Sequence, residues 1–516
     1  MKKPIATWLF LSCLAYSVAG AASKPNIIVI LVDDMGFSDL GCYGSEIETP
    51  NLDKLAAEGL RFSNFYNTSR CCPTRASLLT GLYAHQAGVG AMMEKTQKPG
   101  YLGHLNRNCV TLAEALKPAG YTTLMTGKWH VGDDEGMKPI DRGFDRYWGV
   151  LHGGGLYFKE TMKLKPERKF YQNNELTAPP DDLYVTDEFT DKAIGFIEDS
   201  VKETKKPFFL YLAHIAPHWP LQAKPADIAK YKGRYDEGWD TIRAKRFEKQ
   251  KRLGMVPEHT VLSPRNPEAK PWNEMAGQKQ KDLSHRMEIY AAQIDSIDQN
   301  IGKLVAKLKE LDQIENTLIL FMSDNGCSAE GGPGGFDRGE KDAPIGTALS
   351  YSSAGLEWAN VSDTPYRNFK MFTHEGGIAS PFIAHWPAGI QDKGGIRKTV
   401  GHVIDIMPTL LEVAGAEYPK KVDGKDIKPY EGMSLVSSLK SDTPTSDRIL
   451  YWEHYGRKAV RRGDWKAVSD EKHTWNLYHL KTDPSELIDL AGKEPAKLEE
   501  FKELWQAWAK RCDVLK

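Results

Sequence analysis

Short runs of consecutive apolar residues recur along the chain, and polar residues follow each run directly. Residues 26–32 form the first run, whose β-branched content is typical of a strand buried on both faces of a parallel sheet. Residues 122–126, 208–213 and 318–322 have the same character, and helical segments lie between them. Strands that alternate with helices predict an α/β fold, with a large, mainly parallel sheet flanked by helices.

Two segments show clear helical patterns. Thr49-Pro50 places a polar cap and a proline at the start of a helix that we expect to end near Gly59. Residues 285–310 form the clearest long helix, because their apolar side chains recur at steps of three and four and make one apolar face. The members of this face are Met287, Tyr290, Ile294, Ile297, Ile301, Leu304 and Leu308.

The pattern changes in two later segments of the main domain. Residues 222–284 are charged, and we expect an insertion there that is helical in parts. Residues 328–360 contain a glycine-rich run, 331–335, and no hydrophobic periodicity, which predicts a long loop. The glycines lack the spacing of a phosphate-binding loop, so flexibility is the better interpretation.

A C-terminal subdomain is predicted from residue 440 onward. Short antiparallel strands are expected at 449–452, 458–461, 465–468 and 475–479, before an amphipathic helix at 497–509. We therefore divide the chain into a signal segment of residues 1–22, a main domain of residues 23–439 and an α+β subdomain of residues 440–516.

Residues 1–22 have the layout of a secretory signal peptide. Lys2 and Lys3 precede an apolar stretch at 8–18 and small residues at 19–22. The apolar stretch is too short to span a bilayer comfortably, and no later segment is apolar enough to do so. We expect an exported protein, periplasmic or extracellular, with no membrane partner.

Composition narrows the function further. The 516 residues carry 68 Lys and Arg against 69 Asp and Glu, a net charge of -1. Nucleic-acid binders usually show a clear basic excess, so we expect no nucleic-acid partner. Seven cysteines are present, and six remain if Cys13 leaves with the signal peptide. Six are too sparse in so long a chain for a disulfide scaffold.

The strongest local motif is Cys71-x-Pro73-Thr74-Arg75, continued by a Thr-Gly pair at 80–81. Pro73 suits the first turn of a helix, which places Cys71 just before a helix N-terminus. Free N–H groups and the helix dipole favour an anion there, and the guanidinium of Arg75 could face a tetraoxo-anion. The alternative is two adjacent structural cysteines, Cys71 and Cys72, ahead of an ordinary helix.

Two clusters of oxygen ligands follow predicted strands. Asp33 and Asp34 come directly after the first strand, and Asp324 and Asn325 follow the strand at 318–322. Open α/β sheets place their sites at the carboxyl ends of strands, and these ligands suit calcium or magnesium rather than zinc. A solvated Asp-Asp turn and an ordinary Asn-Gly turn are the alternatives.

Four further residues are candidates for acid–base chemistry or anion binding. Lys128 and His130 follow the strand at 122–126, and His218 follows the strand at 208–213. A lone histidine is more often structural than catalytic, and His214 competes with His218. Lys370, which precedes a Glu-Gly-Gly run at 375–377, is by itself an ordinary surface lysine.

Together these motifs resemble the type I sulfatases of the alkaline-phosphatase superfamily, and most of all the bacterial arylsulfatases. The family signature, Cys-x-Pro-Ser/Thr-Arg followed by Thr-Gly, occupies residues 71–81, and the other clusters match in order from residue 26 to about 387. Cys72 falls at the variable position of the signature. The match between clusters favours His218 over His214, because the Pro-His-Trp-Pro context resembles the family.

The resemblance implies a chemistry for each position. A maturation enzyme oxidises Cys71 to Cα-formylglycine, whose hydrate is the nucleophile and a calcium ligand. One calcium ion is held by Asp33, Asp34, Asp324 and Asn325. The sulfate is neutralised by Arg75, Lys128 and Lys370. His218, with Lys370, protonates the leaving oxygen, Asp324 assists the attack as a base, and His130 accepts the proton of the second hydroxyl.

The expected substrate is a sulfated small molecule or a sulfated carbohydrate. Two rival interpretations stay open at this point. The first is a phosphonate monoester or phosphodiester hydrolase of the same superfamily, which can share the formylglycine and the metal. The second is a catalytically silent, carbohydrate-binding homologue, against which the presence of every expected site residue counts.

Overall fold

The computed structural model describes residues 24–422, 424–442 and 447–514. The predicted signal peptide and Cys13 lie outside these residues, so that prediction stays untested. Among the described helices, none combines the length and the apolar character that crossing a bilayer requires.

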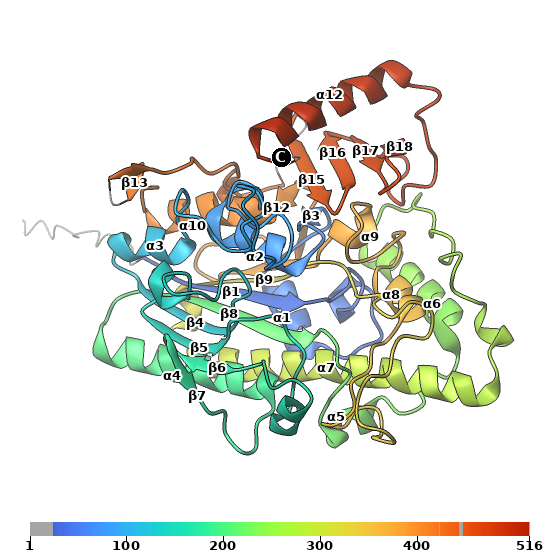
Figure 1. The fold of residues 1–516 in the computed structure, drawn as a ribbon, viewed down its shortest axis with the longest axis horizontal. Coiled ribbons are helices and arrows are strands. Elements are labelled where there is room, and N and C mark those ends of the chain that lie inside the picture. The colour runs from blue at the N-terminus through green and yellow to red at the C-terminus, as the bar shows by residue number, and fades with distance from the viewer. Residues whose placement is uncertain (1–23, 423, 443–446, 515–516) are drawn as a thin grey trace, which may run out of the picture.

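A ten-stranded sheet crosses the centre of the molecule in the order β11-β2-β10-β9-β1-β8-β4-β5-β6-β7 (Figure 1). The strands are β1 (Asn26–Asp33), β2 (Leu60–Phe62), β4 (Thr122–Lys128), β5 (Arg146–Val150), β6 (Phe170–Gln172), β7 (Glu175–Thr177), β8 (Phe208–Pro217), β9 (Thr317–Ser323), β10 (Phe382–His385) and β11 (Gly395–Arg397).

The centre of the sheet, from β9 to β5, is parallel, which confirms the predicted α/β fold. The edges are mixed, because β10 runs antiparallel to β9 and β2, and β6 runs antiparallel to β5 and β7. These edge strands have only three or four residues each, too few to show a hydrophobic period in the sequence.

Side chains of β1 alternate between two hydrophobic cores, one on each face of the sheet. Ile28 and Ile30 enter one core, Ile27 and Val29 enter the other, and all four are fully buried. Burial on both faces is the reason why this strand is a continuous apolar run.

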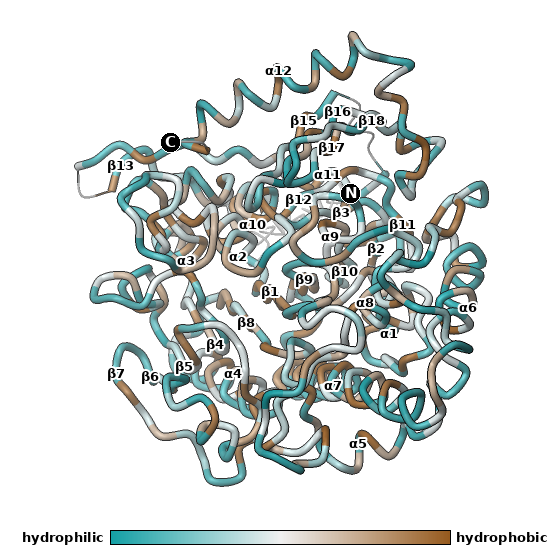
Figure 2. Tube along the Cα trace, turned by 45° about the vertical axis from the view of Figure 1, so that its right-hand side comes forward, coloured by the Kyte–Doolittle hydropathy of each residue, from teal (hydrophilic) through white to brown (hydrophobic). Residues whose placement is uncertain are grey.

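Helices cover both faces of the sheet. Figure 1 shows α4 (Val185–Glu203) and α7 (Gly277–Glu310) below it, and α2 (Cys71–Thr80), α3 (Leu112–Leu116) and α10 (Ile406–Ala414) above it. α1 (Pro50–Glu58) packs against α7. Figure 2 shows the same arrangement as hydrophobic colour along β1 and β8 in the interior, with hydrophilic turns outside.

Two predicted helix starts and one predicted loop differ from the structure. α7 begins at Gly277, eight residues before the predicted start, because its first residues are polar and largely exposed and lack an apolar face. α2 begins at Cys71 itself, so Cys71 lies in the first turn and not before it. The segment at 328–360 is irregular only as far as α8 (Leu356–Ser362).

The glycine-rich run within that segment has a conformational reason. Gly331, Gly332, Gly334 and Gly335 adopt positive φ values between 67° and 98°, which residues with a Cβ rarely adopt.

The predicted insertion at 222–284 contains α5 (Pro225–Lys230), α6 (Gly238–Leu253) and the start of α7.

The C-terminal region forms the predicted antiparallel sheet and closing helix. Its elements are β15 (Ile449–His454), β16 (Arg457–Arg462), β17 (Trp465–Ser469), β18 (Trp475–His479) and α12 (Pro495–Arg511). The indole of Trp452 donates to the carbonyl of Asn67 at 2.7 Å, and buried Lys466 pairs with Glu375 at 2.7 Å. The small sheet therefore shares a core with the main sheet, and the boundary near residue 439 stays a prediction.

Candidate functional site

Polar residues converge where four neighbouring strands end. Asp33 is the last residue of β1 and Lys128 the last of β4. Asp324 follows β9 directly, and His218 follows β8. Because these parallel strands are adjacent in the sheet, their carboxyl ends bring the side chains to one edge, the usual place for a site in an α/β sheet.

Two residues at this edge adopt an unusual backbone conformation. Asp34 has φ 69° and His130 has φ 62°, and each lies one or two residues beyond the end of its strand. Left-handed conformations are costly for residues with a Cβ, and they cluster at functional sites where the surrounding structure holds them.

Asp33, Asp34, Asp324 and Asn325 form a buried oxygen cluster, and none is more than 1% exposed. The amide of Asn325 donates to Asp34 Oδ1 at 2.6 Å, and the backbone N–H of Asp34 donates to Asp324 Oδ1 at 3.3 Å. Among the described residues, Asp33 Oδ1 and Asn325 Oδ1 have no hydrogen-bond partner. Buried acceptors without donors, set among carboxylates, fit a hard cation such as calcium.

Arg75 lies between two of the carboxylates. Its Nη2 lies 2.9 Å from Asp324 Oδ2 and 3.3 Å from Asp33 Oδ2, and Nη1 donates to the carbonyl of Lys128 at 2.9 Å. Sequence reasoning expected this guanidinium to face the sulfate, whereas these contacts position the carboxylates. Its Nε is a buried donor without a partner among the described residues, so one donor stays available.

Two lysines complete the ring of positive charge. Lys128 Nζ bonds to Asp33, and Lys370 Nζ lies 2.8 Å from Asp34 Oδ2. Both ammonium groups are almost fully buried. Burial works against the positive charge of Lys370, but Asp34 and then Glu330 outweigh it and raise its pKa. Lys370 is therefore a buried site residue and not an ordinary surface lysine.

The surroundings shift the pKa values of Asp33 and Asp324 in opposite directions. Burial by itself would raise the pKa of Asp33, but Lys128, His218 and Arg75 lower it to about 2. Burial and the negative charge of Asp33 raise the pKa of Asp324 well above its usual range, against the opposing effect of Arg75. Of two adjacent buried carboxyls, one stays ionised and the other resists ionisation until a further positive charge arrives.

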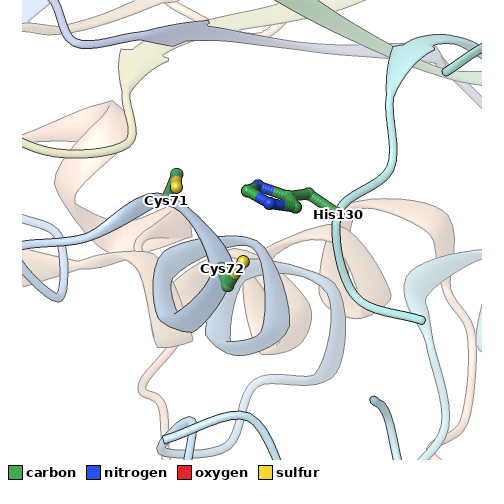
Figure 3. A group of neighbouring side chains, drawn as sticks. All are labelled: Cys71, Cys72 and His130. Atoms are coloured by element: carbon green, nitrogen blue, oxygen red, sulfur yellow. The ribbon is translucent and has the colours of Figure 1, made fainter. Parts of the chain in front are cut away.

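Cys71 occupies the first turn of α2, beside this cluster. The Thr74 hydroxyl donates to the carbonyl of Asp324 at 2.6 Å and ties the helix to the oxygen cluster. A hydrogen bond from Cys72 lowers the pKa of Cys71 well below its usual range, and the charges of Lys128 and His130 add to this against burial. Figure 3 shows the His130 imidazole reaching from the loop after β4 toward both cysteines.

The three histidines have distinct environments. His130 is buried beside Lys128, and these two causes lower its pKa to about 3, so the ring is neutral near pH 7. His218 Nε2 lies 3.6 Å from Asp34 Oδ2, while its Nδ1 lies 2.6 Å from the carbonyl of Trp219. His214 packs beside Phe189 in the core, where burial lowers its pKa to about 4. The structure thus brings His218, and not His214, to the cluster.

Sequence reasoning missed Glu330 and Arg70. Glu330 lies 3.0 Å from Arg70 and 3.7 Å from Lys370, and it accepts a hydrogen bond from the indole of Trp219. Burial would raise the pKa of Glu330, but Lys370, Arg70 and His218 lower it to about 2. Neither residue had a local pattern to reveal it, because Glu330 belongs to the loop after β9 and Arg70 only precedes the helix.

The glycines at 153–155 lie against the two candidate catalytic histidines. A Cβ on Gly153 would lie 3.0 Å from the His130 ring, and one on Gly154 would lie 3.5 Å from His218 Nδ1. A Cβ on Gly155 would lie 2.7 Å from the hydroxyl of Tyr351. Glycine therefore gives the room that both histidines occupy.

All ten candidate site residues predicted from the sequence lie in this one cluster. The whole chain also resembles known proteins. The sulfatase family model matches residues 25–416, and the C-terminal model of N-sulphoglucosamine sulphohydrolase matches residues 366–511. An uncharacterised sulfatase of Schizosaccharomyces pombe is 35% identical over 97% of this chain and 96% of its own length. An arylsulfatase of Klebsiella aerogenes is 35% identical over 84% of this chain and 96% of its own length.

Solved structures agree with these relatives. The structure of Ps i-CgsB in complex with k-i-k-neocarrahexaose has a TM-score of 0.71 and 27% identity, and the match covers 94% of this chain and 93% of that one. The chain belongs to the sulfatase family, which hydrolyses sulfate esters. It is a sulfatase with a large mixed sheet and a small C-terminal antiparallel sheet.

Proposed function

We propose that this sulfatase acts through a formylglycine made from Cys71 and depends on calcium. The observation that carries the proposal is the position of Cys71: it begins α2 beside a buried oxygen cluster in which two acceptors have no partner among the described residues. Calcium bound by Asp33, Asp34, Asp324, Asn325 and the modified residue 71 would act as a Lewis acid and a template.

Formylglycine would supply a geminal diol, of which one hydroxyl attacks sulfur and the other allows sulfate to be expelled. His130 suits the second step, because its ring is neutral near pH 7 and its buried Nδ1 has no partner among the described residues. His218, which lies near Asp34, would give the proton from Nε2 to the departing oxygen as the S–O bond breaks.

The two lysines would neutralise the sulfate. In this structure Lys128 and Lys370 are paired with Asp33 and Asp34. When those carboxylates serve a divalent cation, both ammonium groups can turn to sulfate oxygens and stabilise the charge that develops in the transition state. Arg75 would keep Asp33 and Asp324 in place, with its free Nε available to an oxygen on residue 71.

A sulfated carbohydrate is the substrate class that we favour over a small aryl sulfate. Beside His218, the Trp219 ring contacts Phe336 and Tyr351 at 5.3 and 5.7 Å between centroids. Basic side chains flank these rings, since Arg338 lies 4.2 Å from the ring centre of Phe336. Aromatic rings with adjacent cations suit an anionic sugar, and the related Ps i-CgsB binds a neocarrahexaose.

Export and maturation complete the proposal. A signal peptide at residues 1–22 would send the protein to the periplasm or outside the cell. A formylglycine-generating maturation enzyme would be a protein partner.

Mass spectrometry of the peptide that contains Cys71, taken from active protein, tests the nucleophile. We expect the mass of formylglycine, and an unmodified thiol in fully active protein would refute it. Turnover of aryl sulfate, phosphodiester and phosphonate monoester is compared on the same sample. A preference for phosphorus esters would favour the rival hydrolase, and no turnover of any ester would favour the silent homologue.

A further inference from the structure

Cys72 has no part in the proposed sulfatase chemistry, yet it lies fully buried at the centre of the site. The family signature leaves its position variable. Two adjacent cysteines begin α2, and their surroundings indicate what they can bind.

The two sulfur atoms and the His130 ring form a compact group of ligands. Cys71 Sγ, Cys72 Sγ and a ring nitrogen of His130 all lie within 4.8 Å of one another (Figure 3). The cysteines are held by the first turn of α2, and the N–H of His130 donates to the carbonyl of Leu151 at 3.0 Å. The three donors thus come from two anchored elements.

A second observation points to a ligand at this place. His130 is 7% exposed, and its Nδ1 is buried without a hydrogen-bond partner among the described residues. A buried ring nitrogen without a partner is costly, and a metal ion or a water molecule would remove that cost.

We propose that the chain with both cysteines reduced binds one thiophilic divalent cation, zinc or a close analogue, through Cys71 Sγ, Cys72 Sγ and the His130 imidazole. Two cysteines and one histidine are a known zinc donor set that leaves the fourth position to water. In the bound state both sulfur atoms are thiolates, so their two negative charges balance the charge of the cation, and a sulfur that still carries its proton releases it on binding.

The donor types separate this site from the oxygen cluster. Thiolate and imidazole prefer zinc, cobalt and cadmium, whereas calcium takes oxygen ligands. The neighbouring positive charges are already paired: Lys128 with Asp33, Arg75 with Asp33 and Asp324, and Arg70 with Glu330. Because these ion pairs neutralise the positive charges, their electrostatic repulsion of a cation bound at the sulfur atoms is weakened.

This inference concerns the protein before maturation and does not require the proposed mechanism. Oxidation of Cys71 to formylglycine would remove one thiolate and with it most of the affinity. The matured protein is therefore a folded control that carries every other residue of the site.

The test uses the full-length protein produced without a maturation enzyme, with intact mass showing an unmodified Cys71. The metal-free, reduced protein is titrated with Co²⁺ and with Cd²⁺, and the ultraviolet absorbance of sulfur-to-metal charge transfer is recorded. We expect saturation at one metal per chain, and no competition from millimolar calcium. The Cys72→Ser variant, the His130→Gln variant and the matured protein should each bind the metal more than ~100-fold more weakly. Loss of a residue that only orients the metal ligands has a smaller effect, about 10- to 100-fold.

The control variant is Cys512→Ser, which removes a buried cysteine of the C-terminal region. It should keep the charge-transfer band. Absence of the band in the unmodified protein, or an equal band in Cys72→Ser or in the matured protein, would overturn the proposal. If Cys72→Ser fails to fold, His130→Gln and the matured protein decide, and an equal band in either would overturn the proposal. Sulfatase activity of the matured protein is measured separately, so failure of one proposal does not imply failure of the other.

Discussion

Replacing Arg75 by Met tests whether its guanidinium stabilises the buried carboxylates, independently of any contact that it makes with substrate. The substitution removes the guanidinium contacts with Asp324 at 2.9 Å and Asp33 at 3.3 Å, while the side-chain volume stays similar. Removing one partner of a buried ion pair costs about 3–5 kcal/mol. Because Lys128 still neutralises Asp33, we expect the lower end of that range, about 3 kcal/mol in the free energy of unfolding.

The loss of stability in Arg75→Met should grow with pH. The pKa of Asp324 is already raised above its unfolded value of 3.8, so the folded state binds the proton more tightly than the unfolded state. A raised carboxyl pKa is harmless below the unfolded pKa and costs stability as pH rises above it, by about 1.4 kcal/mol per pH unit until the folded pKa is reached. Without Arg75 the pKa of Asp324 in the folded state rises further, so the pH range over which stability is lost becomes wider.

Urea unfolding at pH 5 and pH 8, with and without calcium, measures both effects. Calcium should restore stability to the variant, since it neutralises the same carboxylates, and binding at ~100 times Kd contributes about 2.7 kcal/mol. Arg252→Met, on the exposed end of α6, is the matched control and should stay within ~0.5 kcal/mol of the parent protein. Equal stability of Arg75→Met and the parent at both pH values would refute the reasoning.

Three further predictions concern residues around the site. His214→Leu should reduce the acid sensitivity of folding: the pKa of His214 is lowered to about 4, so the parent loses stability as pH falls from 6.5 toward 4. The variant should gain about 2 kcal/mol relative to the parent between pH 7.5 and pH 5, and parallel urea midpoints across that range would contradict this. Glu330→Gln should lower kcat/KM for sulfate esters by ~10- to 100-fold, because Lys370 and Arg70 lose the counter-charge that positions them; an unchanged kcat/KM would show that Glu330 is not needed. Arg168 lies beside Tyr351, so Arg168→Ala should raise KM for a sulfated oligosaccharide at least ~10-fold more than KM for an aryl sulfate, and equal shifts for both substrates would count against sugar binding at Trp219 and Tyr351.

The centre of the fold and much of the site could be predicted because their sequence patterns have local causes. β1 is a continuous apolar run since both of its faces are buried, and Asp33 ends that run at the edge where sites form. Asp324 and Lys128 were found for the same reason, because each stands at the end of a buried strand. Cys71 was found through its motif at a helix start.

The remaining features depend on contacts that only the folded chain makes. Glu330 lies in an irregular loop, and what distinguishes it is its proximity to Arg70 and Lys370, which are far from it in the sequence. The antiparallel edge strand β10 has four residues, too few for a period to appear. The first turns of α7 are polar and largely exposed, so no apolar face marks where that helix begins.

The charges of the site predict different effects on sulfate binding for a calcium ion at the oxygen cluster and a zinc ion at the cysteines. Three ionised carboxylates, Asp33, Asp34 and Asp324, would match the charges of Arg75, Lys128 and Lys370, although Asp324 resists ionisation until a further cation binds. A calcium ion on the oxygen side would leave an excess of two positive charges, which attracts a sulfate ester and stabilises the charge that develops as it reacts. A zinc ion on the sulfur side would be balanced by two thiolates, so the bound group would carry no net charge and would not recruit an anion. Occupation of the sulfur side should therefore hold the unmatured protein in a form with little affinity for sulfate esters, and oxidation of Cys71 would remove that obstacle and supply the nucleophile in one change.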